Sequence, residues 1–242
     1  MTWAFLLSVT FIGSVVQSAT GFAFAMIVVP PYVLLLNSAS GVQIAIILSV
    51  VMSIAHLPRL KSAIPTDLLK YIGMGCIGGF PAGIYIYNLL DLAMLKLMVA
   101  IFLIIISLEN TIRLWRGREG SEKHHKGLLA GVGAISGMLG TSLAMPGPLV
   151  MAYLSRTNLA KDEIRATMIS FFVFAYIAIL IVQAAVIGIE KQTWVSSAYM
   201  APAALLGVFL GHQISKKINE TLFKSVVLAI LIIAGAVILF NL

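Results

Sequence analysis

The sequence predicts an all-α membrane protein, a polytopic bundle of transmembrane helices. Sixty per cent of its 242 residues are hydrophobic and only 10% are charged, and the mean hydropathy is +1.04. A soluble domain carries about 25% charged residues, because its surface must be wetted. A chain this apolar needs lipid as its solvent, and in hydrocarbon only helices and closed barrels satisfy every backbone group. The apolar runs are continuous rather than alternating, which favours helices.

Eight apolar runs follow one another along the chain, separated by short charged or turn-rich segments. The most polar segment, from Arg113 to Lys126, divides the chain nearly in half. The sequence therefore predicts a first transmembrane repeat over residues 1–115, a cytoplasmic linker over 116–127 and a second transmembrane repeat over 128–242. The runs cover residues 3–36, 42–57, 71–88, 97–112, 128–154, 166–189, 195–214 and 222–240.

Two matches at one fixed offset indicate that the halves are related repeats. A Gly-x-x-x-Gly motif at residues 79–83 recurs at 207–211, and residues 95–104 match 223–232 at the same offset. Glycines at this spacing are typical of close helix packing in membranes, so we interpret both motifs as packing surfaces.

The distribution of basic residues predicts that the second repeat is inverted relative to the first. If every run crossed the membrane once, lysine and arginine would divide almost evenly between the two sides. If runs 3–36 and 128–154 each enter and leave on the same side, only Lys96 and Lys191 lie opposite all the others, as the positive-inside rule requires. The residues on the cytoplasmic side are then Arg59, Lys61, Lys70, Arg113, Arg116, Arg118, Lys123, Lys126, Arg156, Lys161, Arg165, Lys216, Lys217 and Lys224.

The lengths of runs 3–36 and 128–154 explain how each can return to its own side. Neither reaches the roughly 40 residues that a full transmembrane hairpin needs. We therefore expect a broken or re-entrant helix pair at the start of each repeat, with Gly21 near the first break and Gly137 and Gly140 near the second. Both chain ends are then non-cytoplasmic. Inverted repeats with discontinuous helices are typical of secondary transporters.

Polar and small residues gather at both expected breaks and form the candidate substrate site. Hydroxyls, an amide and the free N–H groups of short helix ends would supply neutral donors that suit a small anion. The alternative interpretation is helix packing, in which hydroxyls bond to the backbone. The residues concerned are Gln17, Ser18, Thr20 and Gly21 in the first half, and Gly140, Thr141 and Ser142, followed by Pro146 and Pro148, in the second.

Four other polar residues are candidates for lining the pathway. Gln43 and Gln183 lie within or near apolar runs, and His56 ends the run 42–57, where an interfacial cap is the simpler interpretation. Arg165 begins the run 166–189, where it would either fix the topology or act as an electrostatic gate for anions. No acidic residue is expected near the centre of any run, so the carboxylate of a proton-coupled carrier is not expected.

The motifs at the two breaks resemble the TauE/SafE sulfite exporter family. The residues that carry the resemblance are Gln17-x-x-Thr-Gly-Phe-x-Phe-Ala…Pro30, Gly137-x-x-Gly-Thr…Pro146-Gly-Pro-Leu-Val-Met-Ala-Tyr-Leu154 and Arg165-Ala-Thr. The resemblance covers essentially the whole chain and implies export of sulfite or an organosulfonate across the bacterial or archaeal inner membrane. The chain departs from the glycine-richest members by having Ala23, Ala25, Leu143 and Ala144.

The sequence thus predicts a secondary transporter of a small anion, not an enzyme, with no cofactor and no metal site. The net charge of +7 lies in loops, so a nucleic acid partner is not expected; the expected partners are the anion and lipid, and a homodimer is left open. An anion channel is an alternative function. An intramembrane serine protease built on Ser142, or a non-transporting scaffold, is a weaker one.

Overall fold

The computed structural model describes residues 2–59, 65–91, 125–154 and 157–214, together with isolated positions between 93 and 108. Within these ranges the regular secondary structure is helical, as the sequence predicts. The elements are α1 (Thr2–Thr20), α2 (Phe24–Leu36), α3 (Ser40–His56), the short 3₁₀ helix η1 (Leu57–Arg59), α4 (Thr66–Leu89), α6 (Lys126–Leu143), α7 (Gly147–Leu154), α8 (Lys161–Val186) and α9 (Lys191–Ile214).

The described helices include three that are long and apolar enough to cross a membrane. They lie at Thr2–Thr20, Glu163–Val186 and Lys191–Ile214. Helices α2 and α3 are apolar but shorter. At 1.5 Å per residue α2 extends about 20 Å, less than the ~30 Å of a hydrocarbon core. The expected runs 97–112 and 222–240 lie wholly or mostly outside the described residues, as does the match of 95–104 to 223–232.

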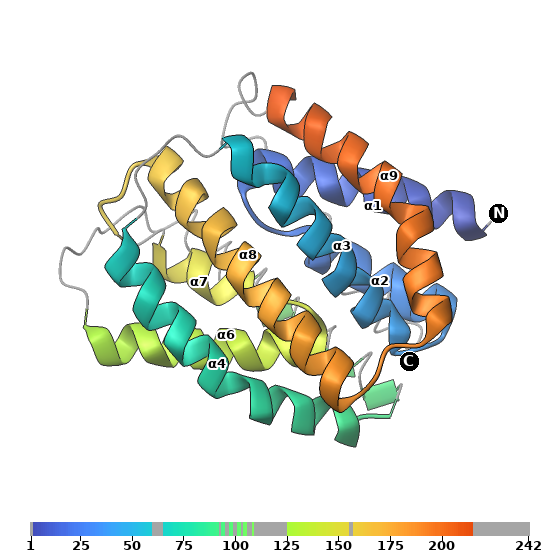
Figure 1. Ribbon diagram of the computed structural model, residues 1–242, viewed down its shortest axis with the longest axis horizontal. Helices are drawn as coiled ribbons and strands as arrows, with labels where there is room; N and C mark the ends of the chain where they lie inside the picture. Colours follow the sequence, from blue (N-terminus) through green and yellow to red (C-terminus); the bar gives the residue numbers. More distant parts are fainter. Residues whose placement is uncertain are drawn as a thin grey trace.

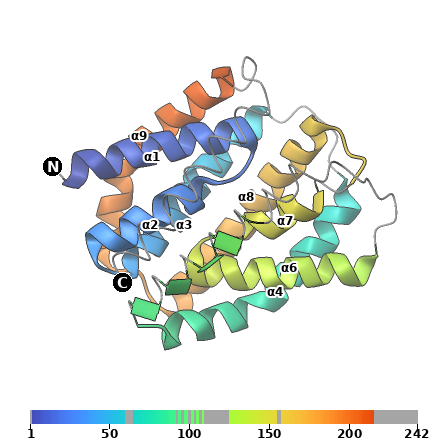
Figure 2. The same cartoon turned by 180° about the vertical axis from the view of Figure 1, so that it is seen from behind.

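The two halves of the chain interlock rather than forming separate bundles. Helix α1 of the first half packs along α9 of the second half, and α4 of the first half packs along α6 of the second. Helices α3 and α8 contact each other between these two pairs (Figures 1 and 2). The core lies around these central helices, where the largest fully buried side chains include Phe24, Tyr32, Ile44, Phe171 and Tyr176.

The Gly-x-x-x-Gly motifs make both interlocking contacts, as their spacing predicts. A β-carbon added at Gly79 of α4 would lie 1.9 Å from the carbonyl oxygen of Ala134 in α6. At Gly207 of α9 it would lie 2.6 Å from the carbonyl oxygen of Phe11 in α1. Each motif thus brings its helix backbone against the backbone of a helix from the other half, which only glycine permits.

The second glycine of each motif repeats this arrangement one turn further on. Gly83 lies against the carbonyl oxygen of Met138 and the hydroxyl of Thr141, and Gly211 lies against Val15 and Ser18. Ser18 and Thr141 are both predicted site residues. The motifs therefore fix where the polar ends of α1 and α6 lie.

The helix break in the run 3–36 falls where the sequence predicts it, but the break in the run 128–154 does not. Helix α1 ends at Thr20, directly before Gly21. In the second half Gly137 and Gly140 are helical, and α6 continues to Leu143. The reason is packing, because a β-carbon at Gly137 would lie 2.0 Å from the carbonyl oxygen of Cys76. The break instead occupies residues 144–146.

A pair of adjacent glycines tests this packing directly. We expect Gly79→Ala to destabilise the protein by about 1–3 kcal/mol, because its β-carbon has no room against α6. Gly78 has no atom within 4 Å of an added β-carbon, so Gly78→Ala should be neutral or stabilising by up to about 1 kcal/mol. Thermal unfolding in detergent measures both, and equal losses of stability would contradict the packing.

Candidate functional site

The first break joins α1 to α2 and is held by side chains of its own last turn. The Phe24 N–H, the first of α2, donates to Oε1 of Gln17 at 3.2 Å. The hydroxyl of Thr20 accepts from the Phe22 N–H and lies 2.7 Å from the Phe22 carbonyl oxygen. Gly21 has a φ of +87° and Ala23 one of 90°. Gln17 therefore spans the break and caps α2 across it.

Helix α8 supplies a positive charge to this break. One guanidinium nitrogen of Arg165, Nη2, donates to the carbonyl oxygen of Ser18 near the end of α1. The aliphatic part of the side chain covers Gly21, where an added β-carbon would lie 3.3 Å from Arg165 Cγ. A cation at a helix C-terminus is favourable, since the carbonyl end of the helix dipole is negative. Arg165 thus lies at the break and is not only a topology signal.

The second break joins α6 to α7 and is closed by backbone hydrogen bonds. The Ala144 N–H donates to Gly140 O at 3.0 Å, and the Met145 N–H donates to Leu139 O at 3.2 Å. Ala144 is left-handed, with a φ of 59°. A left-handed residue followed by a bond back to the last turn of the helix is a Schellman-type termination, in which glycine is usual.

The same helix α8 also contacts the second break. Tyr176 donates through its hydroxyl to Ala144 O at 3.0 Å, and Gln183 donates through Nε2 to Thr141 O at 2.6 Å. Both side chains are buried, at 2% and 0% exposed. The carbonyl oxygens freed at the end of α6 are therefore satisfied by side chains from another helix, as hydrocarbon surroundings require.

Helix α8 thus joins the two breaks along one side of its length. Arg165 meets the first break, and Tyr176 and Gln183 meet the second. The rise of an α-helix separates Arg165 from Tyr176 by about 16 Å along the axis. Figure 2 shows α8 passing behind α7 and beside the α4–α6 pair. A small anion would meet the two breaks one after the other rather than together.

The hydroxyl groups at the two breaks are already hydrogen-bonded to the backbone. Ser18 donates to Val208 O at 2.8 Å, Thr141 to Gly137 O at 2.9 Å and Ser142 to Met138 O at 2.7 Å. Residues 140–142 also lie within helix α6 rather than in a loop. The predicted hydroxyl donors Ser18, Thr141 and Ser142 are therefore engaged in this conformation. The first N–H of α2 is likewise engaged, by Gln17, and Arg165 donates to Ser18 O.

Two further candidates lie away from the breaks. Gln43 donates through Nε2 to Gly188 O at 2.9 Å, just after α8 ends, and so ties α3 to the turn before α9. His56 is buried at the last position of α3. Sequence reasoning did not single out Tyr176, although a hydroxyl in the middle of an apolar run is the kind of signal that marks such a residue.

Some buried side-chain polar atoms have no hydrogen-bond partner among the described residues, and they are divided between α3 and the helices that form or contact the second break. A buried polar group without a partner is costly, so each such atom points to water, an ion or a ligand. The side-chain atoms concerned include Ser49 Oγ and Ser53 Oγ on α3, Ser136 Oγ on α6 and Gln183 Oε1 on α8. The described part of the chain holds no cluster of three or more metal-ligating His, Cys, Asp or Glu residues.

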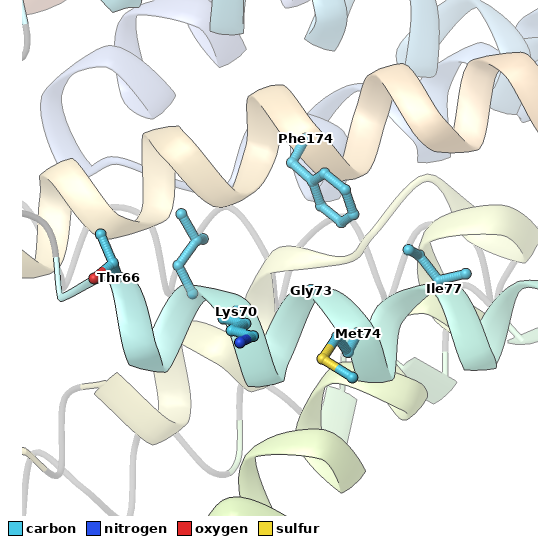
Figure 3. A pocket seen from close by; sticks show the side chains of 7 residues that line it. Thr66, Lys70, Gly73, Met74, Ile77 and Phe174 are labelled. Atoms are coloured by element: carbon cyan, nitrogen blue, oxygen red, sulfur yellow. The ribbon is translucent and has the colours of Figure 1, made fainter.

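A surface groove of about 410 Å³ lies between α4 and α8, away from both breaks (Figure 3). Figure 3 shows Phe174 from α8 above Gly73 on α4, with Ile77 beside it. Its lining is apolar except for Thr66 and Lys70. A groove of this composition offers an anion little beyond one lysine, so we place the candidate site at the breaks instead.

The described part of the chain is helical, with three helices long and apolar enough to cross a membrane. The family model for the sulfite exporter TauE/SafE matches residues 6–238, and the chain belongs to this family. It is therefore a membrane transporter of a small anionic substrate and not an enzyme, which rules out the protease and scaffold alternatives. No curated protein and no solved structure matches the chain.

The four positions that depart from the glycine-rich family pattern divide cleanly in the structure. Ala23 and Ala144 have positive φ, whereas Ala25 and Leu143 are helical. A left-handed alanine is strained by about 1–2 kcal/mol relative to glycine. The first two alanines therefore occupy positions where glycine would be the natural residue.

We expect Ala144→Gly to raise the free energy of unfolding by up to about 1 kcal/mol, because it removes strain at the end of α6. Ala25→Gly, a control in the first turn of α2 where the backbone is helical, should lower it by up to about 1 kcal/mol. Thermal unfolding of both variants in detergent gives the comparison. A loss of stability in Ala144→Gly as large as that in Ala25→Gly would show that Ala144 is not strained.

Proposed function

We propose that the protein is a secondary transporter that exports sulfite or an organosulfonate across the inner membrane. The observation that carries this proposal is the contact of α8 with both helix breaks, through Arg165 at one and through Tyr176 and Gln183 at the other. The positive N-terminal ends of α2 and α7 begin at the same two breaks. An anion would therefore meet positive helix ends at each of the two breaks.

We further propose that the halves, residues 1–115 and 128–242 joined by the linker 116–127, are inverted repeats. The matching roles of Gly79 and Gly207 support this, since each packs the last described helix of one half against the first helix of the other. The strong asymmetry of basic residues supports it as well. The site would then lie at the interface of the repeats, where inverted-repeat transporters bind their substrates.

The proposed direction is export, and the membrane potential is sufficient to drive it. The acidic residues of α4 and α8 lie in the first turn of each helix, at Asp67, Asp162 and Glu163. Neither helix therefore has an acidic residue near its middle that could relay protons. A potential that is negative inside favours exit of an anion by about 2.3 kcal/mol per charge per 100 mV.

Flux of sulfite from proteoliposomes tests the proposed site. We expect Gln17→Ala to reduce flux roughly tenfold, because it removes the hydrogen bond that caps α2 across the first break. Ser8→Ala is a control on the same helix, since its exposed hydroxyl bonds only to Ala4 O of α1. Normal flux in Gln17→Ala would remove the first break from the pathway. Flux that fails to saturate with sulfite concentration would favour the channel alternative.

The topology proposal predicts that both ends of the chain are non-cytoplasmic. Cysteines introduced at Thr2 and Leu242, in a Cys76→Ala background, should react in intact cells with a thiol reagent that cannot cross the membrane. Cysteine at either end that reacts only after the cells are opened would contradict the inverted arrangement.

A further inference from the structure

The groove between α4 and α8 crosses a glycine. Gly73 of α4 is buried, and a β-carbon added there would lie 3.3 Å from the ring of Phe174 in α8. A side chain at this position would therefore occupy part of the groove. Met74 and Ile77 also line it, and both side chains are exposed. The groove is thus an apolar channel along the outer face of two packed helices (Figure 3).

The groove lies at a depth where lipid chains rather than water surround a membrane protein. Helix α8 is one of the helices long and apolar enough to cross a membrane, and its apolar span begins at Glu163. Phe174 lies about 16 Å further along the helix axis, which is close to the middle of a ~30 Å hydrocarbon core. An exposed apolar surface at this depth is covered by acyl chains.

The polar end of the groove points toward the nearer membrane surface. Helices α4 and α8 begin at the same end of the molecule (Figures 1 and 2). Lys70 lies about one helical turn closer to that end than Gly73, and Thr66, the first residue of α4, lies about two turns closer. An exposed lysine near a helix end extends its ammonium group to the headgroup level, and the N-terminal end of the helix dipole also favours an anion there.

A neighbouring aromatic residue marks the same headgroup level. The Nζ atom of Lys126, the first residue of α6, lies 5.3 Å from the centroid of the Tyr71 ring. Tyrosine is enriched where a membrane meets water, and lysine is enriched on the cytoplasmic side. Asp67 lies in the first turn of α4 but is not among the residues that line the groove. The groove therefore runs from hydrocarbon depth to a lysine at the interface.

We propose that this groove binds one molecule of an anionic phospholipid, with an acyl chain over Gly73 and Phe174 and the phosphate at Lys70. A small free anion gains little here, because only Lys70 and Thr66 offer it polar groups. A zwitterionic phospholipid matches the apolar lining, but its headgroup also carries a cation, which the lysine repels. An anionic phospholipid matches both parts. The site is independent of which anion the protein carries.

Lipid titration followed by native mass spectrometry of the purified full-length protein tests the charged part. We expect phosphatidylglycerol to bind about fivefold more tightly than phosphatidylcholine with the same acyl chains, which is the effect of one lysine near an anionic headgroup. Lys70→Gln should abolish this preference without weakening phosphatidylcholine. Lys191→Gln is the matched control and should keep it, since Lys191 is an exposed lysine at the start of α9 that does not line the groove.

The same titration tests the apolar part with a second pair of variants. Ile77→Gln should weaken both phospholipids roughly tenfold and leave the preference for phosphatidylglycerol in place, because it removes apolar contact with the acyl chain alone. Ile181→Gln is the matched control. Ile77 and Ile181 are 52% and 61% exposed, and only Ile77 lines the groove.

The outcomes distinguish a lipid site from a site for free phosphate. A preference for phosphatidylglycerol that survives Lys70→Gln would overturn the proposal, as would inorganic phosphate that displaces the lipid at equal concentration. If Lys70→Gln does not fold, the isoleucine pair decides, and equal affinities in Ile77→Gln and Ile181→Gln contradict the proposal. Sulfite flux is measured separately, so failure of the lipid site leaves the proposed function standing.

Discussion

The structure depends on how a helix can stop inside an apolar chain. Each termination frees carbonyl oxygens at one helix end and N–H groups at the next, and hydrocarbon satisfies neither. Here the carbonyl oxygens are met from α8, by Arg165 at Ser18 and by Tyr176 and Gln183 near the end of α6. Among the N–H groups, that of Phe24 is met by Gln17. The N-terminal ends of α2 and α7 are positive by their helix dipoles, and in the proposed function this is what attracts an anion.

Close packing at glycines also fixes where the two broken helices, α1 and α6, end. Gly83 brings α4 against Thr141, and Gly211 brings α9 against Ser18, so each break is backed by a helix from the other half. A rearrangement at one of these contacts would move the end of a broken helix. In the proposed inverted-repeat transporter, this contact would link helix packing to the position of the proposed site, as alternating access requires.

The sequence predicted the features that depend on local chemistry and missed those that depend on tertiary contact. Gly21 marked the first break because glycine adopts positive φ readily. The second break was misplaced, because Gly137 serves packing against Cys76 while the residue that actually turns the chain, Ala144, gives no local signal. The sequence left open whether the hydroxyls at the breaks face a ligand or the backbone, since a serine in an apolar run looks the same in both cases; the structure shows them bonded to the backbone.

Binding of an oxyanion to the folded protein is the measurement that tests this account most directly. A ligand at 100 times its dissociation constant stabilises the folded state by about 2.7 kcal/mol, which thermal unfolding detects readily. The account predicts that sulfite stabilises the wild type and that Arg165→Gln, which removes the positive charge at the first break, loses most of that effect. Stabilisation of equal size in the variant, or none by any sulfur oxyanion in the wild type, would contradict it.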